Sequence, residues 1–239
     1  MKRHPLVLGL LIALQIQIAV PLVQAKPPAG KPSQGAFVLT AGKDRGHWMS
    51  PKQLPRNGWL ALFDDGKVMR IARTKVVVLK NEGTAPYEMT EVDSKPAGAP
   101  LLFNGVPGLK VGPVHLPEWV RDSGDPSNCG ILPGQTIEMR LGKNRYRLTL
   151  TTSGPGYRDA RLVLETKGRR QVLYAMKGNG DEPHFEVLVL GDLDGDGKLD
   201  LIVTMSPKYS WFPKSVLLSS AAGPGELVHE VASYDDYSC

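Results

Sequence analysis

The sequence predicts a mainly β protein with little helix, built as an antiparallel meander or sandwich or as a partial propeller-like β domain. Short runs of alternating apolar and polar residues recur between turn residues. Glycine and proline, at 26 and 20 of 239 residues, leave little room for long helices. Hydrophobic residues make up 41% and charged residues 22%, a composition that argues against a coiled coil or a wholly disordered chain.

The first 25 residues have the pattern of a secretory signal peptide. Lys2 and Arg3 precede an apolar run at residues 6–20, and residues 23–25 (Val-Gln-Ala) supply the small residues that a signal peptidase recognises. The alternative is a membrane anchor, but the run is shorter than the roughly 20 residues that cross a bilayer. We therefore expect cleavage after residue 25, a secreted or periplasmic protein, and no membrane span in the mature chain.

The charge of the mature chain gives no support for a nucleic-acid partner. The leader carries two of the 29 basic residues and no acidic one, so its removal lowers the net charge from +5 to +3. Nucleic-acid binding needs a concentrated basic stripe, and this charge is small and dispersed along the sequence. We expect no nucleic acid among the partners.

The mature chain has two cysteines, Cys129 and Cys239. An exported protein meets an oxidising compartment, where an even pair of cysteines tends to be bridged. A Cys129–Cys239 disulfide would hold the last residue of the chain and would stabilise the fold by roughly 4–5 kcal/mol in the chain-entropy model. The alternative is a pair of free thiols.

Changes in composition divide the mature chain into four parts. Residues 26–36, rich in Pro, Gly, Lys and Ser, predict a flexible lead-in. Residues 37–95 are expected to form an N-terminal β region, and residues 134–239 a C-terminal β domain. Seven prolines fall within residues 96–133, so we expect loop, edge strand or linker there, as the boundary between two lobes.

Period-two alternation and turn residues place the strands. In the N-terminal region we expect a hairpin around Asp64-Asp65-Gly66 and a strand at the β-branched run 76–79. In the C-terminal domain the clearest hairpin joins 137–141 to 145–151, with alternate residues directed to the core. Further strands are expected at residues 160–166, 170–176, 185–190, 199–205, 215–220 and 227–231.

One short segment carries a specific chemistry. Residues 191–201 read GDLDGDGKLDL, with carboxylates at Asp192, Asp194, Asp196 and Asp200. Four carboxylates so close together repel one another unless a cation lies between them. Calcium is a hard ion that takes about six to eight oxygen ligands at about 2.3–2.6 Å. The spacing therefore predicts a calcium site, in preference to a solvated Asp-Gly hairpin tip.

The predicted site has a defined ligand order. The first three aspartates point inward from a tight loop, and Gly197 permits the turn that brings Asp200 round to close the shell. Lys198 is expected to contribute its backbone carbonyl. The loop is not an EF-hand, because the twelfth position, where an EF-hand has glutamate, is Val203. The flanking residues read as strands, so the ion is expected between two β-strands.

The stretch GDLDGDGKLDLIV resembles the calcium loop of FG-GAP (integrin α-type) repeats and of related bacterial VCBS-type repeats. The resemblance covers residues 185–207. In that family the loop links two strands of a propeller blade, which implies side-chain ligation by the four aspartates and carbonyl ligation by Lys198. A propeller has about four to eight blades, and this sequence has one such loop, so the resemblance implies at most a partial propeller.

No sequence pattern of catalysis accompanies this loop. The sequence contains no G-x-S-x-G nucleophile elbow, no H-E-x-x-H motif and no C-x-x-C motif. We therefore expect an exported binding or structural protein, with no catalytic residue assigned and an extracytoplasmic protein or glycan as partner. Two alternatives stay open: a secreted hydrolase whose catalytic groups are spread through the sequence, and an envelope protein that binds another protein through an apolar patch or an edge strand.

Overall fold

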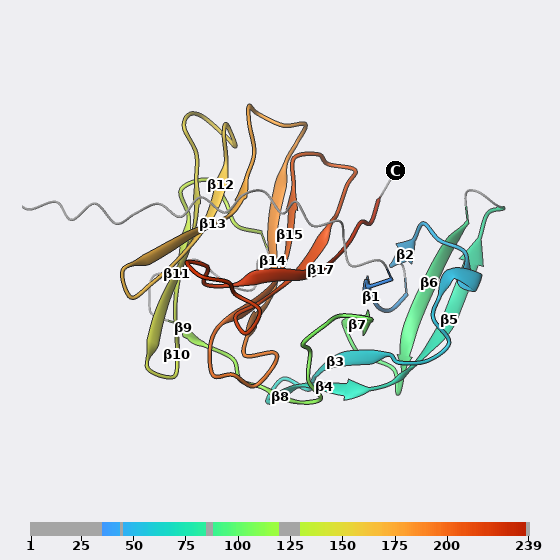
Figure 1. Ribbon diagram of the computed structural model, residues 1–239. Helices are drawn as coiled ribbons and strands as arrows, with labels where there is room; N and C mark the ends of the chain where they lie inside the picture. Colours follow the sequence, from blue (N-terminus) through green and yellow to red (C-terminus); the bar gives the residue numbers. More distant parts are fainter. Residues whose placement is uncertain (1–34, 44, 85–87, 120–129, 238–239) are drawn as a thin grey trace, which may run out of the picture.

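The computed structural model describes residues 35–43, 45–84, 88–119 and 130–237 (Figure 1). These residues form four antiparallel sheets, and their one helix is a short 3-10 turn at Pro51–Gln53. The predicted mainly β, antiparallel fold is thus confirmed. In this part of the chain no helix has the length and apolar character to cross a bilayer. The predicted signal peptide and both cysteines lie outside the described residues.

The N-terminal half forms two sheets. The N-terminal sheet contains, in spatial order, β1 (Phe37–Thr40), β7 (Leu101–Asn104), β3 (Leu60–Asp64), β4 (Met69–Arg73) and β8 (Gly112–Val114). The hairpin sheet contains β2 (Gly46–His47), β6 (Met89–Lys95) and β5 (Lys75–Glu82). Strands β3 and β4 are the hairpin predicted around Asp64-Asp65-Gly66.

The proline-rich range 96–133 contains more regular structure than its composition predicts. Strand β7 lies between β1 and β3 as an interior strand of the N-terminal sheet, where the sequence predicts loop, edge strand or linker. Its four residues, Leu-Leu-Phe-Asn, fall between Pro100 and Pro107, so every backbone N–H of the strand is available for pairing. Pro113 lies in β8, which is an edge strand and tolerates a missing donor.

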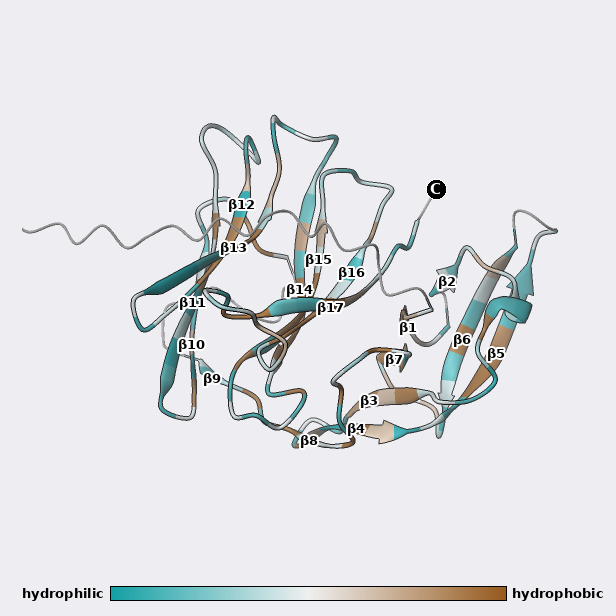
Figure 2. Cartoon of the chain, in the orientation of Figure 1, coloured by the Kyte–Doolittle hydropathy of each residue, from teal (hydrophilic) through white to brown (hydrophobic). Residues whose placement is uncertain are grey.

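The C-terminal half forms two further sheets, and its strands follow the predicted positions. The meander sheet contains, in spatial order, β13 (Arg169–Ala175), β12 (Arg161–Thr166), β11 (Asn144–Thr151), β10 (Thr136–Leu141) and β9 (Glu118–Trp119). The C-terminal sheet contains β14 (His184–Gly191), β15 (Asp200–Ser206), β16 (Lys214–Leu218) and β17 (His229–Tyr234). Figure 2 shows hydrophilic residues on β10 and β13, which also carry the buried apolar residues of the core.

Three apolar cores join the four sheets in series. One core lies between the meander sheet and the C-terminal sheet, and includes Leu148 and Val203. A second lies between the C-terminal and N-terminal sheets, and includes Ile202 and Phe103. The third lies between the N-terminal sheet and the hairpin sheet, and includes Leu102. The order of layers is therefore meander, C-terminal, N-terminal and hairpin sheet, as Figure 1 shows from left to right.

Strand β15 is buried on both of its faces. Every one of its seven residues is buried, because alternate side chains enter two different cores. Leu201 and Val203 enter the core shared with the meander sheet, and Ile202 enters the core shared with the N-terminal sheet. A strand buried in this way needs a nearly continuous apolar sequence, which Leu-Ile-Val supplies.

A buried polar contact joins Asp236, near the C-terminus, to His47 in β2. The His47 side chain in β2 is fully buried, with Nδ1 2.8 Å from Asp236 Oδ2 and Nε2 2.8 Å from the Thr40 carbonyl oxygen. The Lys214 ammonium donates to the same Asp236 oxygen at 2.8 Å. Burial alone would raise the pKa of Asp236, but hydrogen bonds and charge from His47 and Lys214 hold it below its usual value.

Asp236→Asn is expected to lower the free energy of unfolding by about 3–5 kcal/mol, because Lys214 would stay buried without its carboxylate partner. The matched control is Asp235→Asn at the exposed neighbouring position, which should change stability by less than about 0.5 kcal/mol. Urea unfolding at neutral pH measures both values. If both variants lose the same small amount of unfolding free energy, the buried ion pair does not stabilise the fold.

Candidate metal centre

The aspartate loop connects β14 to β15 and begins at a close approach of two backbones. The Asp192 N–H donates to the His115 carbonyl oxygen at 3.0 Å. At Gly191, just before the loop, a Cβ atom would lie 2.8 Å from the Val114 side chain and 3.0 Å from the His115 carbonyl oxygen. Only glycine fits there, so the start of the loop is fixed against the N-terminal sheet.

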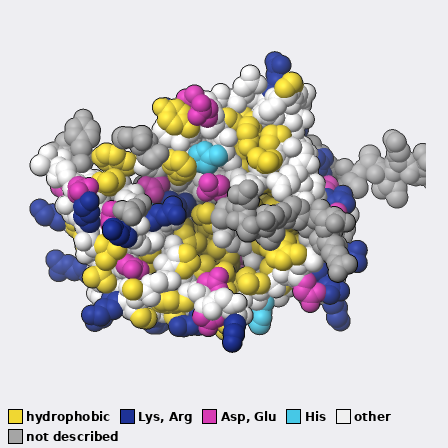
Figure 3. All heavy atoms as spheres, turned by 180° about the vertical axis from the view of Figure 1, so that it is seen from behind, with side chains coloured by type: hydrophobic (Ala, Val, Ile, Leu, Met, Phe, Trp, Pro, Cys, Tyr) yellow, Lys and Arg dark blue, Asp and Glu magenta, His cyan; other side chains and the backbone are white. Residues whose placement is uncertain are grey.

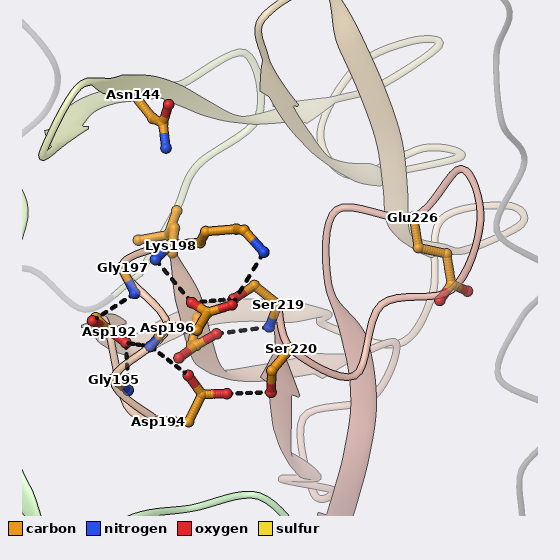
Figure 4. Close-up of polar contacts among 12 residues, drawn as sticks. Asn144, Asp192, Asp194, Gly195, Asp196, Gly197, Lys198, Ser219, Ser220 and Glu226 are labelled. Carbon is orange, nitrogen blue, oxygen red and sulfur yellow. Dashed lines mark hydrogen bonds and ion pairs between the residues drawn. The ribbon is translucent and has the colours of Figure 1, made fainter.

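The Asp192 carboxylate organises the backbone of the loop. Its Oδ1 accepts hydrogen bonds from the N–H groups of Gly195 and Asp196 at 2.7 and 3.0 Å, and its Oδ2 accepts from Gly197 at 3.0 Å (Figure 4). Gly195 and Gly197 have φ angles of 77° and 78°, in the left-handed region that favours glycine. The two glycines of the motif therefore let the chain wrap around the first aspartate.

Asp200 is the first residue of β15 and is fully buried. Its Oδ2 accepts from the Leu193 N–H and its Oδ1 from the Ser219 N–H, both at 2.7 Å. Burial raises the pKa of Asp200 to about 6, and the nearby Asp194 charge acts in the same direction, while the two backbone donors oppose the rise. The surroundings of Asp200 therefore supply too little positive charge to offset the cost of burying its ionised form.

Three of the predicted ligands converge on one point. Asp192, Asp194 and Asp200 are 3%, 1% and 0% exposed, and each places a carboxylate oxygen within 4.8 Å of the others. No lysine, arginine or histidine of the described chain forms an ion pair with any of the three. Buried like charges at this separation repel strongly, and a divalent cation among them would remove that repulsion. The donor set is all oxygen, which suits a hard cation.

Asp196, the fourth predicted carboxylate, does not belong to this group of three. Its Oδ2 lies 3.2 Å from the Lys198 ammonium, and its Oδ1 accepts from the Lys198 N–H at 2.8 Å and from the Ser219 hydroxyl at 2.9 Å. The structure thus places Asp196 and Lys198 together at the rim of the site. The Asp196 carboxylate, which the sequence predicts as a ligand, is therefore outside the group of three, and ligation by the Lys198 carbonyl stays a prediction.

Two serines after β16 complete the polar surroundings and were not predicted. The Ser219 hydroxyl donates to Asp196, and the Ser220 hydroxyl donates to Asp194 (Figure 4). They lie 19 or more residues beyond the loop, so local spacing gives no sign of them. Only the strand order could have indicated these serines. Because β15 and β16 are antiparallel neighbours, the residues that follow β16 lie beside the start of β15.

No protein family, no curated protein and no solved structure matches this chain. The site is therefore interpreted from its own geometry and chemistry. Its three buried carboxylates, held by backbone N–H groups and by the Ser220 hydroxyl from a second segment, form a preorganised oxygen-rich cluster.

Two histidines of the described residues lie beside a carboxylate, which is one of the arrangements that would support the hydrolase alternative. His47 contacts Asp236, but its side chain is fully buried and out of reach of a substrate. His229 Nδ1 lies 2.9 Å from Glu226 Oε2, three residues earlier in the same turn. Within the described chain, no serine or threonine side chain hydrogen-bonds to either imidazole. Neither pair has the attached nucleophile of a catalytic triad.

The burial of Asp200 predicts a pH dependence for the metal-free protein. The folded protein holds the Asp200 proton up to about pH 6, whereas the unfolded chain releases it near pH 3.8, so the folded state binds more protons between these values. The contribution of this group to stability is therefore complete below pH 3.8 and is lost as the pH rises through 6. At about 1.4 kcal/mol per pKa unit, the loss is about 3 kcal/mol.

Urea unfolding of metal-free wild type and Asp200→Asn, followed across this pH range, measures the effect. The stability of wild type relative to the variant should fall as the pH rises, since only wild type carries the titrating group. Asp64→Asn, which removes an exposed carboxylate at the end of β3 and retains Asp200, is the control and should follow the same pH trend as wild type. Parallel stability curves for wild type and Asp200→Asn would contradict the assignment.

Proposed function

We propose that this chain is an exported, β-rich protein with a binding or structural role, in which the loop at residues 192–200 holds a calcium ion. The observation that carries the proposal is the convergence of three buried carboxylates with no cationic partner in the described chain. A site of this kind is costly unless an ion occupies it. The ion would join β14, β15 and the segment after β16 into one unit.

Calcium fits this donor set better than magnesium. Asp192, Asp194 and Asp200 supply carboxylate oxygens, and Ser220 holds a hydroxyl beside Asp194. Calcium accepts many oxygen ligands in flexible geometry, whereas magnesium requires near-ideal octahedral geometry and keeps several waters. For Asp196 to join the shell, as the sequence predicts, its Oδ2 would exchange the Lys198 ammonium for the ion. When bound, the ion supplies positive charge that neutralises the carboxylates.

The exported location rests on the sequence. The leader at residues 1–25 and the Cys129–Cys239 pair both fit an oxidising compartment outside the cytoplasm, where calcium is abundant. The resemblance to FG-GAP and VCBS-type loops supports the same ion, and the loop does connect two antiparallel strands, β14 and β15. We extend the resemblance to this strand–loop–strand unit alone.

Calcium is expected to stabilise the folded protein. With a dissociation constant of about 10⁻⁴–10⁻³ M, typical of extracellular modules, about 10 mM calcium should add about 1.4–2.7 kcal/mol, a rise of several degrees in the unfolding midpoint. Asp194→Asn should abolish the rise, and Asp64→Asn, in another Asp-Gly turn, should retain it. Thermal unfolding in calcium and in chelator tests this. Identical midpoints for wild type in both solutions would reject the calcium site.

A second candidate role, pairing with another protein chain, is favoured by strand β5. This eight-residue strand lies at the edge of the hairpin sheet, and all but one of its residues are exposed. Val77, Val78 and Leu79 are 42%, 42% and 49% exposed, and Figure 2 shows this hydrophobic stretch at the margin of the molecule. The free backbone of an apolar edge strand can pair with another strand.

A second copy of this chain is the partner that β5 fits. An antiparallel pair with Val78 opposite Val78 places Val77 opposite Leu79, and sets no two like charges opposite each other along the strand. Lys80 pairs with Glu82 within its own strand at 2.6 Å, so it adds little repulsion. Such pairing would join two three-stranded hairpin sheets into one continuous sheet.

Sedimentation velocity across a wide range of protein concentrations tests this pairing. Wild type is expected to show a monomer–dimer equilibrium, which Val78→Lys should shift to monomer. Val68→Lys changes another exposed valine, in the turn between β3 and β4, and should leave the equilibrium unchanged. A wild-type protein that stays monomeric at the highest concentration would exclude self-pairing through β5.

A further inference from the structure

The meander sheet concentrates the positive charge of the chain. Ten of the 29 lysines and arginines fall within residues 136–177, together with only three acidic residues. Along the sequence this charge is interrupted by apolar residues and is not evident as a stripe. The fold gathers it, because the strands of the sheet direct their polar residues to one outer face. Figure 3, seen from behind, shows lysine and arginine side chains at the right-hand margin, where the meander sheet lies, and also at the opposite margin.

One row of charges across this face is neutralised internally. The strand register sets Glu138, Arg147, Glu165 and Arg170 side by side on β10 to β13. Arg147 pairs with Glu138 at 2.6 Å, and Arg170 pairs with Glu165 at 3.5 Å. Alternating cross-strand pairs of this kind stabilise an exposed sheet face and leave no net charge.

The next row, toward the hairpin turns, is not neutralised. Arg145 lies directly opposite Arg140, a like-charged cross-strand pair that is unfavourable by itself. Arg140 is paired with Glu118 of β9, whereas Arg145 forms no ion pair within the described residues. The Thr166 hydroxyl donates to the Arg145 carbonyl oxygen at 2.6 Å, which brings the β12–β13 turn beside Arg145.

That turn adds two more cations without carboxylate partners. Arg169 donates to the backbone carbonyl oxygen of Glu226 at 2.5 Å, a contact that leaves its charge uncompensated. Lys167 at the tip of the turn forms no ion pair within the described chain. The pleat directs Arg169 to the same side as the buried Gln171, toward Glu226. Arg145 and Lys167 are therefore the uncompensated cations beside the hollow on the outer face.

The hollow has the size of a small-ligand site. Its volume is about 400 Å³, and its charged lining consists of five basic residues, Arg145, Arg147, Lys167, Arg169 and Arg170, against Glu138 and Glu165. Guanidinium groups present forked N–H donors that match the oxygens of sulfate and phosphate groups. A saccharide carrying such groups would meet Arg145 and Lys167, whose charges are uncompensated, while its hydroxyls reach the neighbouring glutamates.

We propose that this hollow on the outer face of the meander sheet binds a saccharide that carries sulfate or phosphate groups. The proposal goes beyond the calcium site, since it concerns a different surface and different residues. Nucleic acid is less suited to the hollow, because single strands need exposed aromatic rings for stacking. The one aromatic residue in the lining, Tyr146, is 6% exposed and directed to the core.

The test is a titration of the full mature chain with a sulfated heparin hexasaccharide in low salt, performed in chelator so that the calcium site plays no part. We expect saturable binding, weakened as salt is raised. The double variant Arg145→Ala/Lys167→Ala should weaken binding at least about tenfold, the loss of two charge-assisted contacts. Both side chains are exposed, so folding should be unaffected, and an unchanged thermal midpoint verifies this.

The matched control is Arg158→Ala/Lys177→Ala, which removes two exposed basic residues from the opposite end of the same sheet. It should weaken binding less than about twofold, because charges beyond a Debye length are screened. Equal weakening by the two double variants would overturn the site, as would the absence of binding. Equal affinity for inorganic sulfate would indicate a free-anion site and no saccharide specificity. Equal or tighter binding of single-stranded DNA would assign the surface to nucleic acid. Each of the last two results also overturns the proposal.

Discussion

The burial of β15 on both faces is the constraint on which the rest of the molecule depends. Its alternate side chains serve two cores, so the C-terminal sheet becomes the central layer that joins the meander sheet to the N-terminal sheet. The strand begins at Asp200, and the same burial carries that carboxylate into the interior. A charged residue at the start of a fully buried strand requires compensation from its neighbours.

The compensation is local and comes from two segments. The aspartate loop turns back so that the Leu193 N–H reaches Asp200, and the segment after β16 brings the Ser219 N–H to its other oxygen. These two backbone donors give each Asp200 oxygen one hydrogen bond without removing the charge. Asp192 and Asp194 add two more buried charges of the same sign. The carboxylates of the site therefore have hydrogen-bond donors, but the repulsion among their negative charges remains. A bound cation is the ordinary solution to that imbalance.

The sequence was most informative where a single physical signal decided the structure. Alternation fixed the β10–β11 hairpin, because Tyr146, Leu148 and Leu150 must share one face, and Asp-Gly spacing located the loop whose first carboxylate binds the backbone. Residues that depend on strand order, such as Ser219, could not be found from local spacing. The run Val-Val-Val-Leu in β5 reads like a buried strand, yet the structure leaves it at a sheet edge, since periodicity carries no information about which neighbour covers a strand.

The distribution of charge on the surface is even harder to predict from the sequence. A net charge of +5 over 239 residues appears dispersed because each arginine of β11 is followed by a core residue. The pleat of the sheet separates these two sets, and antiparallel pairing then stacks the polar sets of neighbouring strands on one face. The acidic loop and the basic face arise from different strands and share no ion pair in the described residues, so one can be altered while the other keeps its charge. A chain organised in this way can use a cation to hold its central layer and still present a separate surface to an anionic ligand.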